Sequence, residues 1–204
     1  MSKKSKEQLA MLQGRKLPPI PPIPPAALLK LDIGCGKNKR EGFKGVDQYA
    51  MTGVDFVMDV RETPWKWRDN SVEEIHCSHF IEHLTGAERV GFMNELYRVL
   101  RNGGKATIIV PHWASNRAYG DPTHQWPPVS EMWFYYLLSD WRKREAPHTD
   151  IEFNKDGYSC NFQATWGYNM SPALAARNQD YQQFALANYK EAALDTQAQL
   201  IAVK

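Results

Sequence analysis

The chain has 204 residues, 43% of them hydrophobic and 24% charged, which fits one globular domain and is too short for two ordinary ones. No apolar run approaches the roughly 18 residues of a membrane-spanning helix, and the start lacks the basic-then-apolar order of a secretory leader. Three cysteines, Cys35, Cys77 and Cys160, are too few and too scattered for a disulfide framework. We therefore expect one domain in the reducing cytoplasm, without membrane contact.

The formal net charge of +2 conceals an uneven distribution. Of the 25 basic and 23 acidic residues, six and one respectively lie in residues 1–30, which leaves 19 against 22 and a net charge of −3 for the rest. A slightly acidic domain is not typical of a general nucleic-acid binder. Nucleic acid therefore stays a possible partner that the charge does not indicate.

Residues 1–27 form a basic, proline-rich N-terminal extension, with six of the thirteen prolines between residues 18 and 25. Proline fixes φ and removes a hydrogen-bond donor, so this segment is expected to be extended polyproline II. It could serve as a ligand for a protein partner with an aromatic groove. A stiff spacer that leads into the domain is the favoured interpretation. The domain itself is expected to span residues 28–204.

The domain opens with a short apolar strand that ends in glycines, Leu28 to Gly36 (LLKLDIGCG). Gly34 and Gly36 let a backbone turn approach a ligand more closely than any Cβ would allow. A Gly-x-Gly turn is a weak signal by itself, because ordinary turn chemistry also produces it. Its meaning depends on the elements that follow.

Further strands are expected at residues 43–48, 54–60, 72–78 and 105–110. Between the last two, Thr85 and Glu88 form a capping box that predicts a helix, ended by Asn102-Gly103-Gly104. Strands that alternate with helices predict a doubly wound α/β domain, with its ligand at the carboxyl ends of the strands. Near the C-terminus we expect a strand at 161–170, a long helix at 173–194 and a closing strand at 198–204.

Five segments in this order resemble class I S-adenosylmethionine-dependent methyltransferases, in a compact branch similar to methyltransferase type 11. They are LDIGCG, GVDQY, the DV of VMDV, SHFIEHL and YRVLRNGGKATIIVPH, and together they cover about residues 28–112. The resemblance implies a Rossmann-like, mostly parallel seven-stranded sheet with shortened helices after the first two strands. It also implies S-adenosyl-L-methionine as cofactor and an enzyme that transfers its methyl group.

The resemblance assigns eleven residues near successive strand ends to the cofactor. It places Asp32 at the methionine amino group and Gly34, Cys35 and Gly36 along the methionine and ribose. It places Asp47 with Gln48 at the ribose hydroxyls, Asp59 and Val60 at the adenine, and Ser78, His79 and Phe80 beside the sulfonium.

Two departures from the family pattern stand out. Asn38 replaces the third glycine of the usual turn, and residues 37–44 are too few for a helical crossover. The first helix should therefore be nearly absent, with one face of the sheet thinly covered. A nicotinamide-binding fold is the main structural competitor, but its third glycine position holds Lys39 here.

Four clustered side chains, His76, Cys77, His79 and His83, raise the question of a metal site. Strand alternation places His76 and Cys77 on opposite faces, and no HExxH or CxxC is present. We therefore expect no metal. His79 is the better candidate for the active site, whereas His83 is expected to pin the start of a helix, and Cys35 and Cys77 are expected to be small packing residues.

Residues 112–147 are predicted to be a loop or lid insertion that faces the methyl acceptor. Eight aromatic residues lie between 112 and 141, and they would either form a cage for a planar or sugar-like acceptor or pack the lid itself. Three titratable side chains there, His112, Asp121 and His124, are the candidate catalytic residues, since one of them could take a proton from the acceptor.

The predicted function is methyl transfer from S-adenosylmethionine to a small molecule or a saccharide. A nucleotide or RNA acceptor is the alternative, as is a non-catalytic S-adenosylmethionine-binding protein on the same fold. Since SHFI follows the predicted fourth strand, the N/D-P-P-Y/F motif is absent, which disfavours amine methylation of DNA bases. No Pro-Cys nucleophile follows it either, which disfavours carbon-5 methylation of cytosine.

Overall fold

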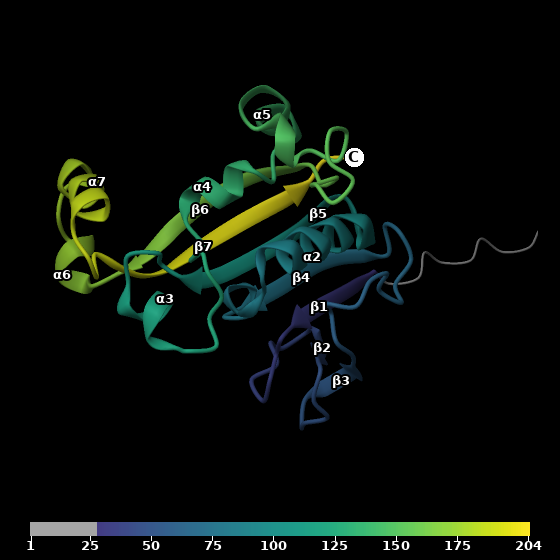
Figure 1. Ribbon diagram of the computed structural model, residues 1–204. Coiled ribbons are helices and arrows are strands. Elements are labelled where there is room, and N and C mark those ends of the chain that lie inside the picture. The colour runs from purple at the N-terminus through teal and green to yellow at the C-terminus, as the bar shows by residue number, and fades with distance from the viewer. Residues whose placement is uncertain (1–27) are drawn as a thin grey trace, which may run out of the picture.

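The computed structural model describes residues 28–204, and the predicted extension of residues 1–27 lies outside them (Figure 1). Its strands form one seven-stranded sheet in the order β3-β2-β1-β4-β5-β7-β6. The strands are β1 (Leu29–Ile33), β2 (Lys44–Asp47), β3 (Val54–Val57), β4 (Val72–Ser78), β5 (Leu100–Pro111), β6 (Phe162–Met170) and β7 (Ala193–Ala202). The first five are parallel, and β7 runs antiparallel between β5 and β6. This confirms the predicted mostly parallel sheet with two late strands.

Most helices of the described chain are short. They are η1 (Ile81–His83), α2 (Gly86–Val99), α3 (Asn116–Gly120), α4 (Glu131–Tyr135), α5 (Ser139–Glu145), η2 (Pro147–Thr149), α6 (Pro172–Ala175) and α7 (Gln179–Asn188). Figure 1 shows α6 and α7 together at one end of the sheet. None of the helices within residues 28–204 combines the length and the apolar character that a membrane crossing requires.

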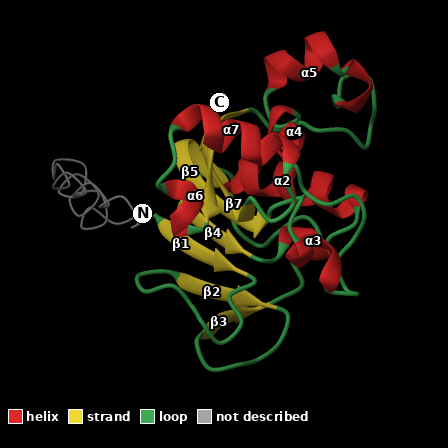
Figure 2. Cartoon of the chain, turned by 90° about the vertical axis from the view of Figure 1, so that its left-hand side faces the viewer, coloured by secondary structure: helices red, strands yellow, loops and turns green. Residues whose placement is uncertain are grey.

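Helix α2 covers one face of the sheet, and its start has the expected capping box. The Thr85 side chain accepts a hydrogen bond from the Glu88 amide, and the Glu88 carboxylate accepts one from the Thr85 amide over 2.8 Å. Its buried residues Phe92, Met93 and Leu96 belong to the main hydrophobic core. Helices α2 and α4 lie on the same side of the sheet (Figures 1 and 2).

The opposite face of the sheet is open along β7. Ala198 and Leu200 are fully buried, whereas the alternate residues Gln197, Gln199 and Ile201 are exposed.

Between β1 and β2 the chain makes turns and no described helix, which agrees with the expected loss of the first helix. The carboxyl end of β1 is therefore joined to β2 by turns and not by a crossover helix.

The end of α2 differs from the prediction. The helix stops at Val99, not at Asn102-Gly103-Gly104, and β5 begins at Leu100, before the predicted strand at 105–110. Leu100 is fully buried and pairs with Val72 of β4, so its apolar side chain draws the backbone into the sheet. The pairing of β4 with β5 shifts register between Leu100 and Lys105, and Gly103, with φ of +71°, allows the backbone to make this shift.

The single helix predicted at 173–194 is wrong. Ser171 caps the four-residue α6, Asn178 caps α7 through a bond to the Tyr181 amide, and α7 ends at Asn188. Asparagine favours a helix start over a helix interior, because its side chain bonds the free amides. The closing strand β7 begins at Ala193 rather than Ala198, since residues 193–202 alternate between buried and exposed positions.

Candidate active site

The glycine turn after β1 is tied to the end of β2 by one carboxylate. Asp47 Oδ2 accepts a hydrogen bond from the Gly36 amide, and Oδ1 accepts one from the Tyr49 amide, both over 3.0 Å. Gly36 has φ of +52°, and a Cβ added there would meet no atom within 4 Å. The turn therefore borders open space, and a ligand can approach its backbone closely.

Asp32 supports the same turn from inside the protein. Its side chain is buried: Oδ2 accepts a hydrogen bond from the Arg40 amide, and Oδ1 lies 2.7 Å from Nδ1 of His76. Through the Arg40 amide, Asp32 fixes the connection that follows the glycine turn. His76 faces Asp32, whereas Cys77 is fully buried on the other face of β4, so the two side chains do not share a site.

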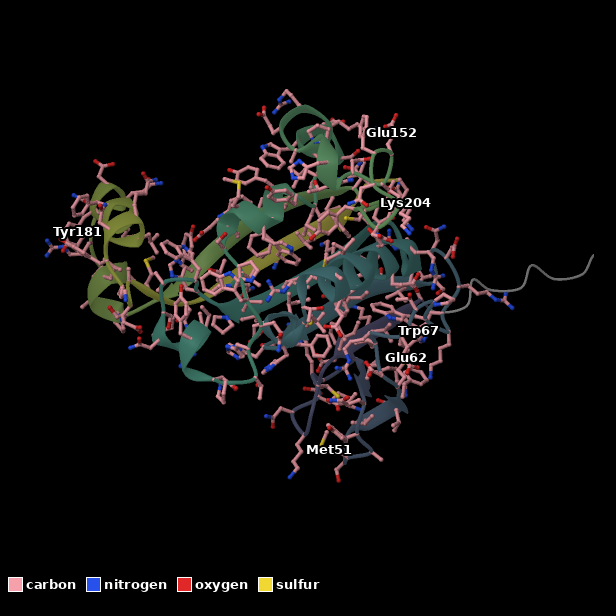
Figure 3. All side chains as sticks on the ribbon, in the orientation of Figure 1. Met51, Glu62, Trp67, Glu152, Tyr181 and Lys204 are labelled. Atoms are coloured by element: carbon pink, nitrogen blue, oxygen red, sulfur yellow. The ribbon has the colours of Figure 1, made fainter. Side chains whose placement is uncertain are left out.

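A cavity of about 270 Å³, which we call the β2–β3 pocket, opens at the ends of these two strands. It is lined by Gly34, Val46, Asp47, Gln48, Tyr49, Met51, Met58, Asp59, Val60, Arg61, Phe80, His83 and Leu84. Six of the eleven residues assigned to the cofactor are among them. Figure 3 shows Met51 in the connection between β2 and β3, at the edge of the molecule.

The other five assigned residues lie around this pocket or beneath it. Asp32 is buried, and Gly36 borders the open space already described. Cys35 is buried too, and its sulfur lies in the space that a Cβ on Gly45 would need. Ser78 and His79 line a separate, larger cavity of about 750 Å³ on the open face of the sheet.

Arg61 is a pocket residue that the sequence analysis missed. Its guanidinium and backbone amide donate to the Asp59 carboxylate, with the shortest contact at 2.6 Å, and this lowers the pKa of Asp59. Asp59 itself follows β3, which ends at Val57, so it lies in a loop. The close Asp-x-Arg spacing was the available signal, because a side chain two residues away readily reaches a loop carboxylate.

His79 stands at the carboxyl end of β4 with an unusual backbone. Its φ is +52°, a region that residues with a Cβ seldom adopt, and its amide donates to the Ile109 carbonyl over 2.8 Å. Its Nδ1 lies 3.3 Å from Glu82 Oε1, and Glu82 raises the pKa of His79. Such strained residues gather at functional sites, where the surrounding structure holds them in place.

A third cavity, of about 590 Å³, adjoins the β2–β3 pocket, and we call it the acceptor cleft. It is lined by His79, Glu82, His83, Pro111, Arg117, Gly120, Asp121, Pro122 and His124. His83 lines both cavities, so the two meet at the residues that follow β4. Two of the three predicted catalytic residues, Asp121 and His124, lie in this cleft.

His124 and Asp121 are held in defined orientations. His124 Nδ1 is 3.3 Å from the Ala118 carbonyl oxygen, to which it donates, so Nε2 carries the free lone pair. Nε2 is 3.8 Å from Asp121 Oδ2. The hydroxyl and amide of Thr123 donate to Asp121 and hold the pKa of its carboxyl below the usual value.

His112, the third predicted catalytic residue, lines neither cavity. Its side chain is fully buried, its Nδ1 accepts a hydrogen bond from the Ala114 amide, and Nε2 therefore carries the proton. Nε2 lies 3.2 Å from Glu131 Oε1, which lowers the pKa of Glu131. The contacts of His112 thus join the end of β5 to α4, and its ring has no open path to an acceptor.

The aromatic residues of the loop do not form a cage around the acceptor cleft. None of the eight lines it in the part of the chain that the structure describes. Phe134 is fully buried, Trp133 and Tyr136 pack against the core, and Trp126 is 77% exposed. Of the two predicted roles, a cage for the acceptor or packing of the loop, Trp133, Phe134 and Tyr136 therefore have the packing role.

Comparison with known proteins agrees with this fold. Residues 31–108 match the sequence model of a methyltransferase domain family, Methyltransf_11. A methyltransferase from Archaeoglobus fulgidus, described as SAM dependent, superposes with a TM-score of 0.59 at 16% identity over 86% of each chain. The small RNA methyltransferase HEN1 gives a TM-score of 0.51 at 12% identity, covering 98% of this chain and 25% of that one. No curated protein sequence matches significantly.

The order of the sheet is that of the solved S-adenosylmethionine-dependent methyltransferases, and the family match over residues 31–108 agrees with the predicted class I, type 11-like branch. The match over residues 31–108 also agrees with the predicted S-adenosylmethionine cofactor and methyl-transfer reaction. The predicted fold is thereby confirmed. The residues that hold the cofactor and the identity of the acceptor belong to the proposals below.

Proposed function

We propose that the protein is an S-adenosylmethionine-dependent methyltransferase that acts on a small polar acceptor, a metabolite or a saccharide, bound in the acceptor cleft. The observation that carries the proposal is that this 590 Å³ cleft adjoins the β2–β3 pocket and is lined mainly by polar and charged side chains. An acceptor rich in hydroxyl or amine groups can satisfy such a lining, because polar walls favour a ligand that forms hydrogen bonds with them.

For the cofactor, we propose that the adenosine portion occupies the β2–β3 pocket. Each Asp47 oxygen already accepts one backbone bond and retains a lone pair that a ribose hydroxyl can use. Asp59, Val60 and Met58 would surround the adenine. The methionine portion would cross the glycine turn at Gly34 and Gly36, which brings the sulfonium towards His79.

The proposed mechanism is an in-line displacement at the methyl carbon. The nucleophilic oxygen or nitrogen of the acceptor forms a bond to that carbon, the carbon–sulfur bond breaks, and its electron pair returns to sulfur to give S-adenosylhomocysteine. The acceptor proton leaves to a base of the acceptor cleft, which the predicted catalytic residues Asp121 and His124 both line. Positioning and exclusion of water would supply most of the rate.

RNA is the second candidate acceptor, supported by the structural similarity to a small RNA methyltransferase. The net charge of −3 over residues 31–204 argues against it, since RNA binding usually draws on a basic surface. A non-catalytic S-adenosylmethionine-binding protein is the third. Such a protein would bind S-adenosylmethionine but would transfer no methyl group to any acceptor.

A methyl-transfer screen with labelled S-adenosylmethionine tests the proposal against separate pools of metabolites, glycans and nucleic acids. We expect label in the metabolite or glycan pool, and label only in RNA would contradict the acceptor class. Calorimetry is the companion experiment, with micromolar binding of S-adenosylmethionine and S-adenosylhomocysteine expected. Either ligand should raise the melting temperature by mass action. Absence of heat with both would contradict the proposed cofactor site.

A further inference from the structure

Three side chains in the acceptor cleft form a cluster that methyl transfer by itself does not explain. Glu82, His83 and His124 each bring one potential metal-ligand atom to within 4.8 Å of the other two. Glu82 and His83 belong to η1, directly after β4, and His124 comes from the loop after α3. The fold thus joins residues that are about 40 positions apart in sequence.

Glu82 has an unusual environment for a carboxylate. It is only 4% exposed, and neither of its oxygens has a hydrogen-bond partner among residues 28–204. The neighbouring Arg89 donates instead to the carbonyls of Ile81, Pro127 and Gln125. His79 Nδ1 lies 3.3 Å from Oε1 without the geometry of a hydrogen bond. A buried carboxylate without such partners is costly and favours a bound cation.

The two imidazoles are held in the protonation state that a metal requires. Thr123 Oγ1 donates to Asp121 over 2.6 Å, so its oxygen is left to accept the proton of His83 Nδ1, 3.0 Å away. His124 Nδ1 donates to the Ala118 carbonyl. Both rings therefore have Nε2 unprotonated, and metal-bound histidines typically donate their other N–H to a protein oxygen in this way.

The same contacts give Asp121 and Thr123 a place around the cluster. Asp121 orients Thr123, and Thr123 orients His83, with the rings of His83 and His124 only 4.7 Å apart between centroids. Carboxylates in such supporting positions fix the ring and its tautomer. A pair of histidines that served packing alone would need neither this chain of hydrogen bonds nor a buried carboxylate, Glu82, without a hydrogen-bond partner.

We propose that Glu82, His83 and His124 bind a divalent transition-metal ion, with Zn²⁺ as its representative. Two imidazoles and one carboxylate are a known ligand set for zinc with an open position, and imidazole disfavours Mg²⁺ and Ca²⁺. The open position would face the acceptor cleft and bind an acceptor oxygen; only this last consequence rests on the proposed function. From the sequence, His76, Cys77, His79 and His83 were considered as ligands and no metal was expected, and Glu82 and His124 were not among the candidates.

Metal binding can be measured without cofactor or acceptor. The full chain, stripped with a chelator, is dialysed against Zn²⁺, and bound metal is quantified by mass spectrometry. We expect about one ion per chain, and at least tenfold weaker binding in Glu82→Gln, His83→Ala and His124→Ala. His148, an exposed histidine of η2, provides the control, and His148→Ala should bind as the parent does. Mg²⁺ at equal concentration should bind more weakly.

A stability measurement separates a ligand from a merely structural carboxylate. Without metal, Glu82→Gln should melt at the parent temperature or above, because it removes a buried charge that lacks a hydrogen-bond partner. With Zn²⁺, the parent should melt at a higher temperature and the variant should not. Parent-like zinc binding by Glu82→Gln, or equal loss in His148→Ala, would overturn the proposal. So would an absence of zinc binding by the parent, whatever the outcome with S-adenosylmethionine.

Discussion

Oδ2 of Asp47 accepts a hydrogen bond from the amide of Gly36 over 3.0 Å, so the end of β2 and the glycine turn after β1 form one unit. The two residues are eleven positions apart and need no helix between them. Parallel strands usually require a longer crossover. Here β1 and β2 pair directly, and the carboxylate replaces the missing helix as the feature that fixes the turn.

The first prediction compares two aspartates of neighbouring strands. Asp47→Ala should weaken S-adenosylmethionine binding by roughly 1.5–3 kcal/mol, because it removes a charged acceptor for the ribose and frees the Gly36 amide. Asp55→Ala should change binding far less, since Asp55 bonds to Lys39, Lys44 and the Gly45 amide, outside the β2–β3 pocket. Calorimetric dissociation constants decide between them, and equal values for the two variants would refute the assignment of Asp47.

Asp55 provides a second prediction, on acid stability. Its bonds to Lys44, the Gly45 amide and Lys39 hold the pKa of Asp55 well below its usual value. A depressed folded pKa means that the stabilisation is complete above the unfolded pKa, about 3.9, and is lost as the pH falls below it. Asp55→Asn should therefore melt below the parent at pH 7, and the difference should shrink below about pH 4. Thermal unfolding at several pH values tests this, and a constant difference would contradict it.

The third prediction concerns Gly34, whose φ is +68°. A Cβ there would lie 2.8 Å from the Phe80 ring, and the left-handed conformation itself costs a residue with a side chain about 1–2 kcal/mol. Gly34→Ala should lower both the melting temperature and the affinity for S-adenosylmethionine. Gly86→Ala is the matched control, since a Cβ at this first position of α2 meets nothing within 4 Å. If both variants melted alike, the close approach to Phe80 would be unimportant.

The fold was largely predictable because its signals are local. The capping box of Thr85 and Glu88, the alternation of residues 72–78 and the glycine turn at 34–36 each need only a few neighbouring residues. Element ends were less predictable. Leu100 leaves α2 because it packs against a distant strand. Ala193 and Leu194, the first residues of β7, were assigned to the end of a helix, because the pairing of this strand with β5 and β6 is not visible in the local sequence.

The candidate site was predictable where strand ends define it and not where loops fold back. Asp47 ends β2, while Asp59 and His79 follow β3 and β4, so their position at one edge of the sheet could be inferred from strand order. The contact of His124 with His83, and the burial of His112 beside Glu131, depend on the path of an irregular loop. No local period encodes that path. The three residues predicted to be catalytic, His112, Asp121 and His124, therefore have different surroundings in the fold, with His112 buried and the other two in the acceptor cleft.

The last prediction tests this division of the site with His124 and Asp121. Both line the acceptor cleft, and neither lines the β2–β3 pocket. His124→Ala and Asp121→Ala should lower turnover of the acceptor found by the screen at least tenfold, about 1.4 kcal/mol of barrier, and leave S-adenosylmethionine affinity within about twofold. Steady-state kinetics and calorimetry on the same preparations give the two numbers. Parent-like turnover in both variants would make the loop a packed cover without a role in the reaction. Loss of cofactor affinity would instead place these residues in the cofactor site and contradict the separation of the two cavities.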